Sequence, residues 1–245
     1  MGKNKDVFDK FQKSLNHLSE KNVRVLETNV PVETQMEYFR FSEHVRKIKD
    51  ISAVDEQIEV LHSPDVLPEA KQYAMTALAI SGEVKAFRAL EAYANEVEPE
   101  LSDWLAMAVL QARITLESEF SDEKRVFIST GLGGKGNRLR FYALFQSEDL
   151  EPFSDYQRTL IEKEIPFQVQ KYNGEVEEID VADNYFSIVF LISLHEDIKT
   201  MLQNAIAECN EYGQFISTSF IVTNIKRFDK REIELEFSKN RKLNG

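Results

Sequence analysis

The chain has 245 residues, of which 42% are hydrophobic and 29% charged, so it is long enough to form two folded domains. Its net charge of −12 at pH 7 repels phosphate backbones and anionic lipid, which argues against a dedicated DNA-binding or membrane-surface protein. The single cysteine excludes an internal disulfide, no Cys/His cluster predicts a metal site, and no apolar run is long enough for a membrane span. We therefore expect a cytoplasmic protein with no metal and no other cofactor.

The N-terminal part of the chain has the apolar spacing of amphipathic helices. One helix is predicted from Val7 to Leu18, where apolar residues recur every three or four positions. A second is predicted over residues 31–49, with Pro31 at its first position. Such apolar stripes need partners, which predicts a helical first domain.

Two segments between residues 53 and 118 align at an offset of 31 residues without a gap. Each contains a helix, a turn and a longer Ala-rich helix that begins at a proline, Pro68 or Pro99. The predicted helices cover 53–62, 68–81, 83–95 and 99–117. The aligned pairs are Val66 and Val97, Pro68 and Pro99, Glu69 and Glu100, Tyr73 and Trp104, and Ala77 and Ala108. The pattern resembles HEAT-like helical repeats, which stack and bind partner proteins; an ordinary helical bundle is the alternative.

The periodicity changes from helical to two-residue alternation near residue 120. Residues 125–130 and 138–146 are rich in β-branched and aromatic side chains and flank a glycine cluster, which predicts a hairpin. We therefore place a domain boundary near Ser121, with a helical domain over 1–120 and an α+β domain over 121–245.

The second domain has the element order βαββαβ. The expected elements are strand 138–147, helix 153–165, strand 168–181, strand 184–193, helix 195–212 and strand 215–228. Pro166 is expected to close the first of these helices, and Gly213 to end the second. The order resembles the ferredoxin-like fold, with 125–130 as an extra edge strand. A last strand is predicted at 232–237, where Glu-Ile-Glu-Leu-Glu-Phe alternates.

The glycine cluster at 131–136 satisfies the spacing of a dinucleotide-binding motif but lacks its context. A helix must follow the glycines to meet the pyrophosphate, yet residues 138–146 continue as a strand. The P-loop alternative fails because Gly136 follows Lys135 where a Ser or Thr must reach magnesium. Neither nucleotide-binding class is predicted.

Residues 124–147 are instead a basic island with no acidic residue. Backbone N–H groups at a glycine-rich tip can bind an anion, and nearby Phe141, Tyr142 and Phe145 could stack on RNA bases. The alternative is that the glycines serve only turn geometry and the aromatic residues form core. The candidate anion-binding residues are Gly133, Gly134, Lys135, Gly136, Arg138 and Arg140.

No residue constellation predicts catalysis. The four histidines are scattered, and Cys209 lies mid-helix with no paired base, so we expect a buried thiol and no enzyme. The first hypothesis is a protein-interaction or regulatory protein that binds another protein or itself. The second is RNA or ribosome association through residues 131–140, and the third is small-molecule sensing.

Overall fold

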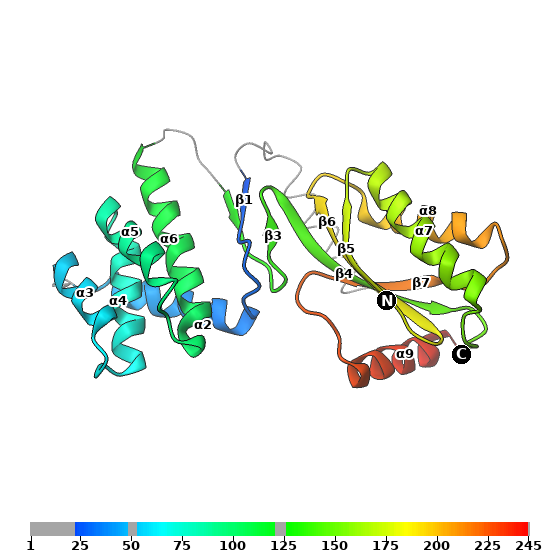
Figure 1. The fold of residues 1–245 in the computed structure, drawn as a ribbon, viewed down its shortest axis with the longest axis horizontal. Coiled ribbons are helices and arrows are strands. Elements are labelled where there is room, and N and C mark those ends of the chain that lie inside the picture. The colour runs from blue at the N-terminus through cyan, green and yellow to red at the C-terminus, as the bar shows by residue number, and fades with distance from the viewer. Residues whose placement is uncertain (1–22, 49–52, 121–125, 245) are drawn as a thin grey trace. The chain divides into compact units, whose positions relative to one another are not determined.

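The computed structural model describes residues 23–48, 53–120 and 126–244. Its contacts divide the chain into two compact units. The helical unit comprises residues 1–139 with 193–195, and the sheet unit comprises residues 140–192 with 196–245. Helices come first and an α+β sheet follows, so the predicted fold class is confirmed (Figure 1). The boundary near Ser121 stays a prediction.

The helical unit contains the helices predicted between residues 31 and 117. They are α2 (Val32–Val45), α3 (Val54–His62), α4 (Pro68–Ile80), α5 (Val84–Tyr93), the short 3₁₀ helix η2 (Pro99–Leu101) and α6 (Ser102–Phe120). The helix predicted from Val7 to Leu18 lies outside the described residues. None of the described helices is long and apolar enough to cross a membrane.

Both prolines of the aligned segments stand where helices begin. Pro68 is the first residue of α4, and Pro99 is the first residue of η2, which leads directly into α6. A proline is tolerated there because the first backbone N–H groups of a helix have no intrahelical acceptor. Pro31 instead immediately precedes α2. Whether the helix pairs are HEAT-like repeats stays a prediction.

The core of the helical unit is organised around α4 and an internal polar network. Tyr38 and Trp104 pack edge to face with ring centroids 5.2 Å apart. The Trp104 ring N–H donates to Thr76 Oγ1 at 3.1 Å, and the Tyr38 hydroxyl donates to Gln111 Oε1 at 2.7 Å. Burial raises the pKa of Tyr38, so the phenol stays neutral and its hydrogen bond persists. Each of these polar tips is paired, so none of them adds the free-energy cost of an unmet hydrogen bond.

A charged cluster ties α4 to the turn after α5. The side chain of Lys71 is almost fully buried, and its ammonium group forms an ion pair with Glu98. The Tyr93 hydroxyl donates to the other Glu98 oxygen at 2.8 Å. The hydrogen bond from Lys71 is the main reason that the pKa of Glu98 falls to about 2. This cluster fixes where the chain enters η2.

A small sheet in the helical unit was not predicted and corrects the predicted hairpin. The strand β1 (Val23–Val25) pairs in parallel with β2 (Val126–Ile128), which lies within the predicted strand at 125–130, and β2 does not pair with the strand that follows the glycines. The hairpin instead joins β3 (Gly134–Lys135) to the start of β4 (Arg138–Ser147). Local alternation identified β2 as a strand, but only the tertiary structure supplied its partner, 103 positions away in register from Val23 to Val126.

The sheet unit confirms the predicted order βαββαβ. Its elements are β4, α7 (Asp155–Lys171), β5 (Glu175–Val181), β6 (Tyr185–Ser193), α8 (Ile198–Asn210) and β7 (Ile216–Thr223), followed by α9 (Lys230–Asn244). The order of neighbouring strands is β3-β4-β6-β5, with β7 antiparallel to β4. The strands β7 and β5 therefore form the two outer edges of this unit.

Helices cover both faces of this sheet (Figure 1). The phenyl rings of Phe145 on β4 and Phe186 on β6 stack 4.5 Å apart and are fully buried. The helices α7 and α8 lie on one face, and α9 lies on the other, where Phe237 contacts Tyr185 with centroids 6.0 Å apart. Burial of aromatic and aliphatic side chains between these layers stabilises the unit.

The predicted end of the first helix in this unit was wrong. Pro166 does not close the first helix but lies inside α7, because Ile161, Ile165 and Val169 continue the buried stripe beyond it. The strand predicted at 168–181 therefore begins only at Glu175, after a turn.

The strand predicted at 232–237 is part of α9. Ile233 and Phe237 are four positions apart and both are buried, which a helix places on one face. Asp229 and Glu232 also exchange hydrogen bonds at the helix start, because each backbone N–H donates to the other side chain. The alternating residues fit the period of a strand as well as that of a helix. The cap at Asp229 and the burial of Ile233 with Phe237 favour the helix.

Candidate functional site

The glycine-rich segment packs closely against the chain that follows β1. Gly133 is buried with φ +65°, and a Cβ atom there would lie 2.7 to 2.9 Å from the carbonyl oxygens of Leu26, Glu27 and Thr28. No side chain fits such a contact, so the glycine is required by both conformation and space.

The neighbouring glycines are needed for two different reasons. At Gly134 a Cβ atom would lie 2.2 Å from the Arg138 carbonyl oxygen and 2.6 Å from Val25 Cγ1. Positive φ values occur at Gly133 and Gly136 but not at Gly134, so close approach is what excludes a side chain at Gly134. Gly136 forms the β3–β4 turn with φ +64° and has open space around it.

The turn already holds an anion from its own chain. The Gly136 backbone N–H donates to the Glu27 carboxylate at 3.1 Å. A left-handed glycine turn thus presents a donor to a carboxylate oxygen, the chemistry proposed for an external phosphate. An external anion at Gly136 would have to displace Glu27.

The other candidate anion-binding residues are divided between the two units. Lys135 is exposed and Arg138 is half-buried, and both belong to the helical unit with the three glycines. Arg140 belongs to the sheet unit, where its guanidinium forms a two-point ion pair with Glu177. The anion site therefore stays a prediction, now restricted to the β3–β4 turn.

The aromatic residues after the turn lie inside the sheet unit. Phe141, Tyr142 and Phe145 are 3%, 4% and 0% exposed. The Phe141 ring stacks on Phe190 at 5.8 Å, and burial raises the pKa of Tyr142. These rings are core side chains and are not presented to solvent as a stacking surface.

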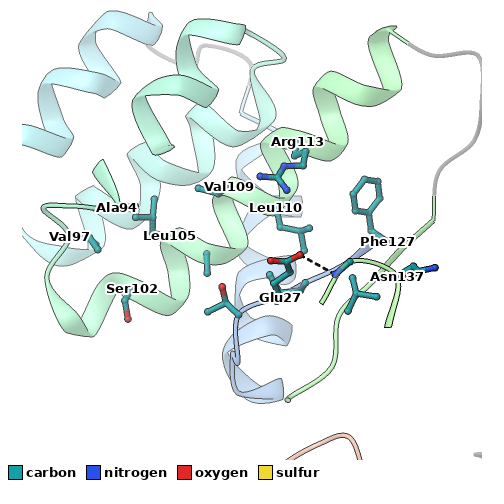
Figure 2. A pocket seen from close by; sticks show the side chains of 15 residues that line it. Glu27, Ala94, Val97, Ser102, Leu105, Val109, Leu110, Arg113, Phe127 and Asn137 are labelled. Atoms are coloured by element: carbon teal, nitrogen blue, oxygen red, sulfur yellow. Dashed lines mark hydrogen bonds between the residues drawn. The ribbon is translucent and has the colours of Figure 1, made fainter. Parts of the chain in front are cut away.

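A cleft of the helical unit lies between α6 and the β1 segment (Figure 2). Its volume is about 950 Å³. One wall comes from α6 and from Ala94 and Val97 near the end of α5, and the other comes from residues 25–28, Phe127 and the β3–β4 turn. The apolar part of the α6 wall consists of Leu105, Ala106, Val109 and Leu110. The cleft is therefore a mainly apolar groove closed at one side by the glycine-rich turn.

Polar groups stand at the margins of this cleft. The Glu27 carboxylate and Asn137 lie at the turn, and Ser102 lies at the start of α6. Arg113 lies further along α6, where its guanidinium is 3.8 Å from Glu91 and 5.9 Å from the Phe87 ring centroid. An apolar floor with a few polar groups at its rim is typical of a binding site.

A second groove lies next to the first on α6, on the far side of Leu110. It has a volume of about 410 Å³ and lies between α6 and α2. Leu110 lines both grooves, so together they form one hollowed face of α6, which we call the α6 face. Phe39 on α2 borders the second groove and is 46% exposed, which is high for a phenylalanine.

Sequence reasoning did not find the α6 face. The one available signal was that α6 is apolar around most of its circumference, as expected of a helix covered on all sides. The described structure covers part of this circumference and leaves Ala106, Val109, Leu110 and Ile114 half-buried. Only the tertiary arrangement shows which side is open.

The remaining candidate groups have structural surroundings. Cys209 is fully buried in α8, and burial raises the pKa of its thiol to about 12, so it is not a nucleophile at neutral pH. Across the three described stretches of chain, no group of three or more His, Cys, Asp or Glu residues is placed to hold a metal ion.

Comparison with known proteins identifies no family for this chain. No protein-family model matches the chain, and no curated protein matches it. One solved structure, described as a "putative transposase" from Deinococcus radiodurans R1, covers 42% of this chain and 90% of its own, with 10% identity and a TM-score of 0.37. A likeness this low carries no argument about what this chain does.

The sequence-based expectation that the chain is not an enzyme is nevertheless corrected. That expectation relied only on the lack of a known catalytic motif, and a catalytic site need not carry one. The solved structure above is described by the name of an enzyme. We therefore withdraw the expectation that the chain has no enzymatic activity.

Proposed function

We propose that this chain is an interaction protein whose helical unit binds an amphipathic helix of a partner protein along the α6 face. The observation that carries the proposal is the pair of grooves, about 950 and 410 Å³, that meet at Leu110. Helices that stack in layers bury an apolar face on both sides, and the α6 face is an apolar layer without a covering helix among the described elements.

A helix of the partner protein fits the α6 face better than a flat surface of the partner would. The open positions Ala106, Leu110 and Ile114 are four residues apart, so they form one stripe along α6. A partner helix with apolar residues at positions i, i+3, i+4 and i+7 can place them in such a stripe. The rim offers charges of both signs, Arg113 and Arg46 against Glu27 and Glu43, which would orient the partner.

The test is Ala106→Trp, which fills the groove. A labelled model peptide with leucine at helical spacing is titrated into the protein, and fluorescence anisotropy measures its affinity. The indole would occupy the groove, so we expect affinity to fall by roughly tenfold or more. Val84→Trp is the matched control, because Val84 is exposed on α5 and outside both grooves, and it should bind as wild type does. Equal binding of a sequence-scrambled peptide would refute the proposal.

RNA association is a second candidate, favoured by the β3–β4 turn. The Gly136 N–H already binds a carboxylate, and Lys135 beside it is exposed. If RNA binds there, Lys135→Ala should leave the melting temperature nearly unchanged, because this side chain is exposed, while weakening RNA binding and flattening its salt dependence. Filter binding at several salt concentrations measures this. Purified protein with no nucleic-acid absorbance and an unaffected Lys135→Ala variant would rule RNA out.

The cleft volume also lies in the range that small ligands occupy. A small-molecule sensor would show a melting temperature raised by particular metabolites, because a ligand that binds only the folded state stabilises it. Ala106→Trp distinguishes peptide binding from small-molecule sensing only when its effect on the peptide is measured. The peptide and the metabolites are therefore both tested on the same protein.

A further inference from the structure

The strand β7 has the composition of a central strand but lies at an edge of the sheet. Residues 213–225 contain no charged side chain, in a chain that is 29% charged. The central strand β6 is similarly uncharged because layers on both faces bury it. Among the described residues β7 pairs with β4 and with no further strand. Its outer backbone groups are thus available to another strand.

The opposite edge of the same sheet is protected by charge. The edge strand β5 carries four acids in seven residues, Glu175, Glu177, Glu178 and Asp180. Charged side chains along an edge strand prevent a second chain from pairing with it. Charge therefore disfavours pairing of a further strand at the β5 edge of the sheet but not at the β7 edge.

The regular part of the β7 edge is short and well defined. Phe220 to Thr223 pair in register with Phe145 to Tyr142, and an irregularity precedes them at residues 217–219. Beyond the strand, Ile225 is 56% exposed. A groove of about 390 Å³ runs beside β7 against α8, with Gln203, Ala207, Gln214 and Thr218 among its lining residues and Glu211 as its only charged one. Apart from Glu211, the surface that extends from the strand edge onto α8 is therefore uncharged.

We infer that the β7 edge is a self-association surface, where a second copy of this chain adds its own β7 antiparallel at Phe220–Thr223. Two copies with a net charge of −12 repel each other over most of their surfaces, so contact is favoured where acids are absent. Antiparallel pairing of identical strands about a two-fold axis makes a closed dimer with one continuous sheet. This surface is separate from the α6 face, and the inference does not depend on the proposed function.

The first experiment measures the mass of the full chain in solution by light scattering over a concentration series. We expect wild type to have twice the mass of one chain. Ser219→Lys should give the single-chain mass or weaken dimerisation by at least roughly tenfold, because a charged side chain next to the paired segment of an edge strand disfavours the addition of a second strand. Ser219 is exposed and its N–H faces Ser217 Oγ at 3.5 Å, so the fold should tolerate the change. Asp180→Lys, on β5, is the matched control and should remain dimeric.

The second measurement needs no variant. Hydrogen exchange of the amides in 217–224 should slow as wild-type concentration rises, since pairing protects the outer N–H groups. A single-chain mass at all concentrations would overturn the inference, whether these amides exchange fast or are protected by another part of the same chain. So would a dimer that persists in a folded Ser219→Lys variant with exchange at 217–224 independent of concentration.

Discussion

Gly133→Ala should destabilise the helical unit by about 3 kcal/mol or more. The added methyl group would lie 2.7 to 2.9 Å from three carbonyl oxygens of residues 26–28, and the backbone has φ +65°, which L side chains rarely adopt. Because the neighbours are backbone atoms, they cannot move without displacing the segment that follows β1. Chemical denaturation followed by circular dichroism measures the loss.

Gly136→Ala is the matched control for this prediction. It has nearly the same backbone conformation, φ +64°, but nothing lies within 4 Å of its Cβ position. Only the conformational term applies, so we expect a loss of about 1 kcal/mol. Equal losses in the two variants would mean that the contact with residues 26–28 is absent and that the wall of the cleft is placed differently.

Asn210→Ala should cost the sheet unit about 3 kcal/mol, because three buried hydrogen bonds depend on one amide. The Asn210 Nδ2 donates to the Ile216 carbonyl oxygen at 2.8 Å, and its Oδ1 accepts from the N–H groups of Phe215 and Ile216 at 3.2 and 3.0 Å. Alanine leaves these backbone groups buried without partners, since Phe215 and Ile216 are 6% and 1% exposed. Thermal and denaturant unfolding check the value.

The same substitution at Asn204, on the same helix, controls for helix effects. Its side chain is exposed and makes one hydrogen bond, to the Tyr172 hydroxyl at 2.7 Å. Asn204→Ala should therefore change the free energy of unfolding by no more than about 0.5 kcal/mol. A comparable loss at both positions would show that Asn210 does not hold the start of β7. If Asn210 does hold it, Asn210→Ala should also weaken any association through β7.

The sequence by itself determined the elements whose signals are local. Helical spacing and the prolines at 68 and 99 placed the starts of α4 and η2, because a proline is tolerated at the first position of a helix and excluded from the next turn. Alternation, runs of β-branched and aromatic residues, and turn residues gave the order βαββαβ, because all of these signals lie within a few neighbouring residues.

The tertiary structure decided every feature that depends on residues far apart. The partner of β2 is the three-residue strand β1, which lies 103 positions earlier in the sequence. A strand this short has no residue pattern that would identify it. The letters of 232–237 fit both periods, and the cap at Asp229 together with the burial of Ile233 and Phe237 makes them helical.

The candidate sites divide in the same way. The sequence identified the glycines but could not show that Gly133 packs on residues 26–28 or that Glu27 binds the Gly136 N–H, because both contacts span more than 100 residues. The open side of α6 and the free edge of β7 are properties of what the rest of the fold leaves uncovered. Local residue patterns report which side chains are apolar, whereas the packing of whole elements determines which of them stay exposed.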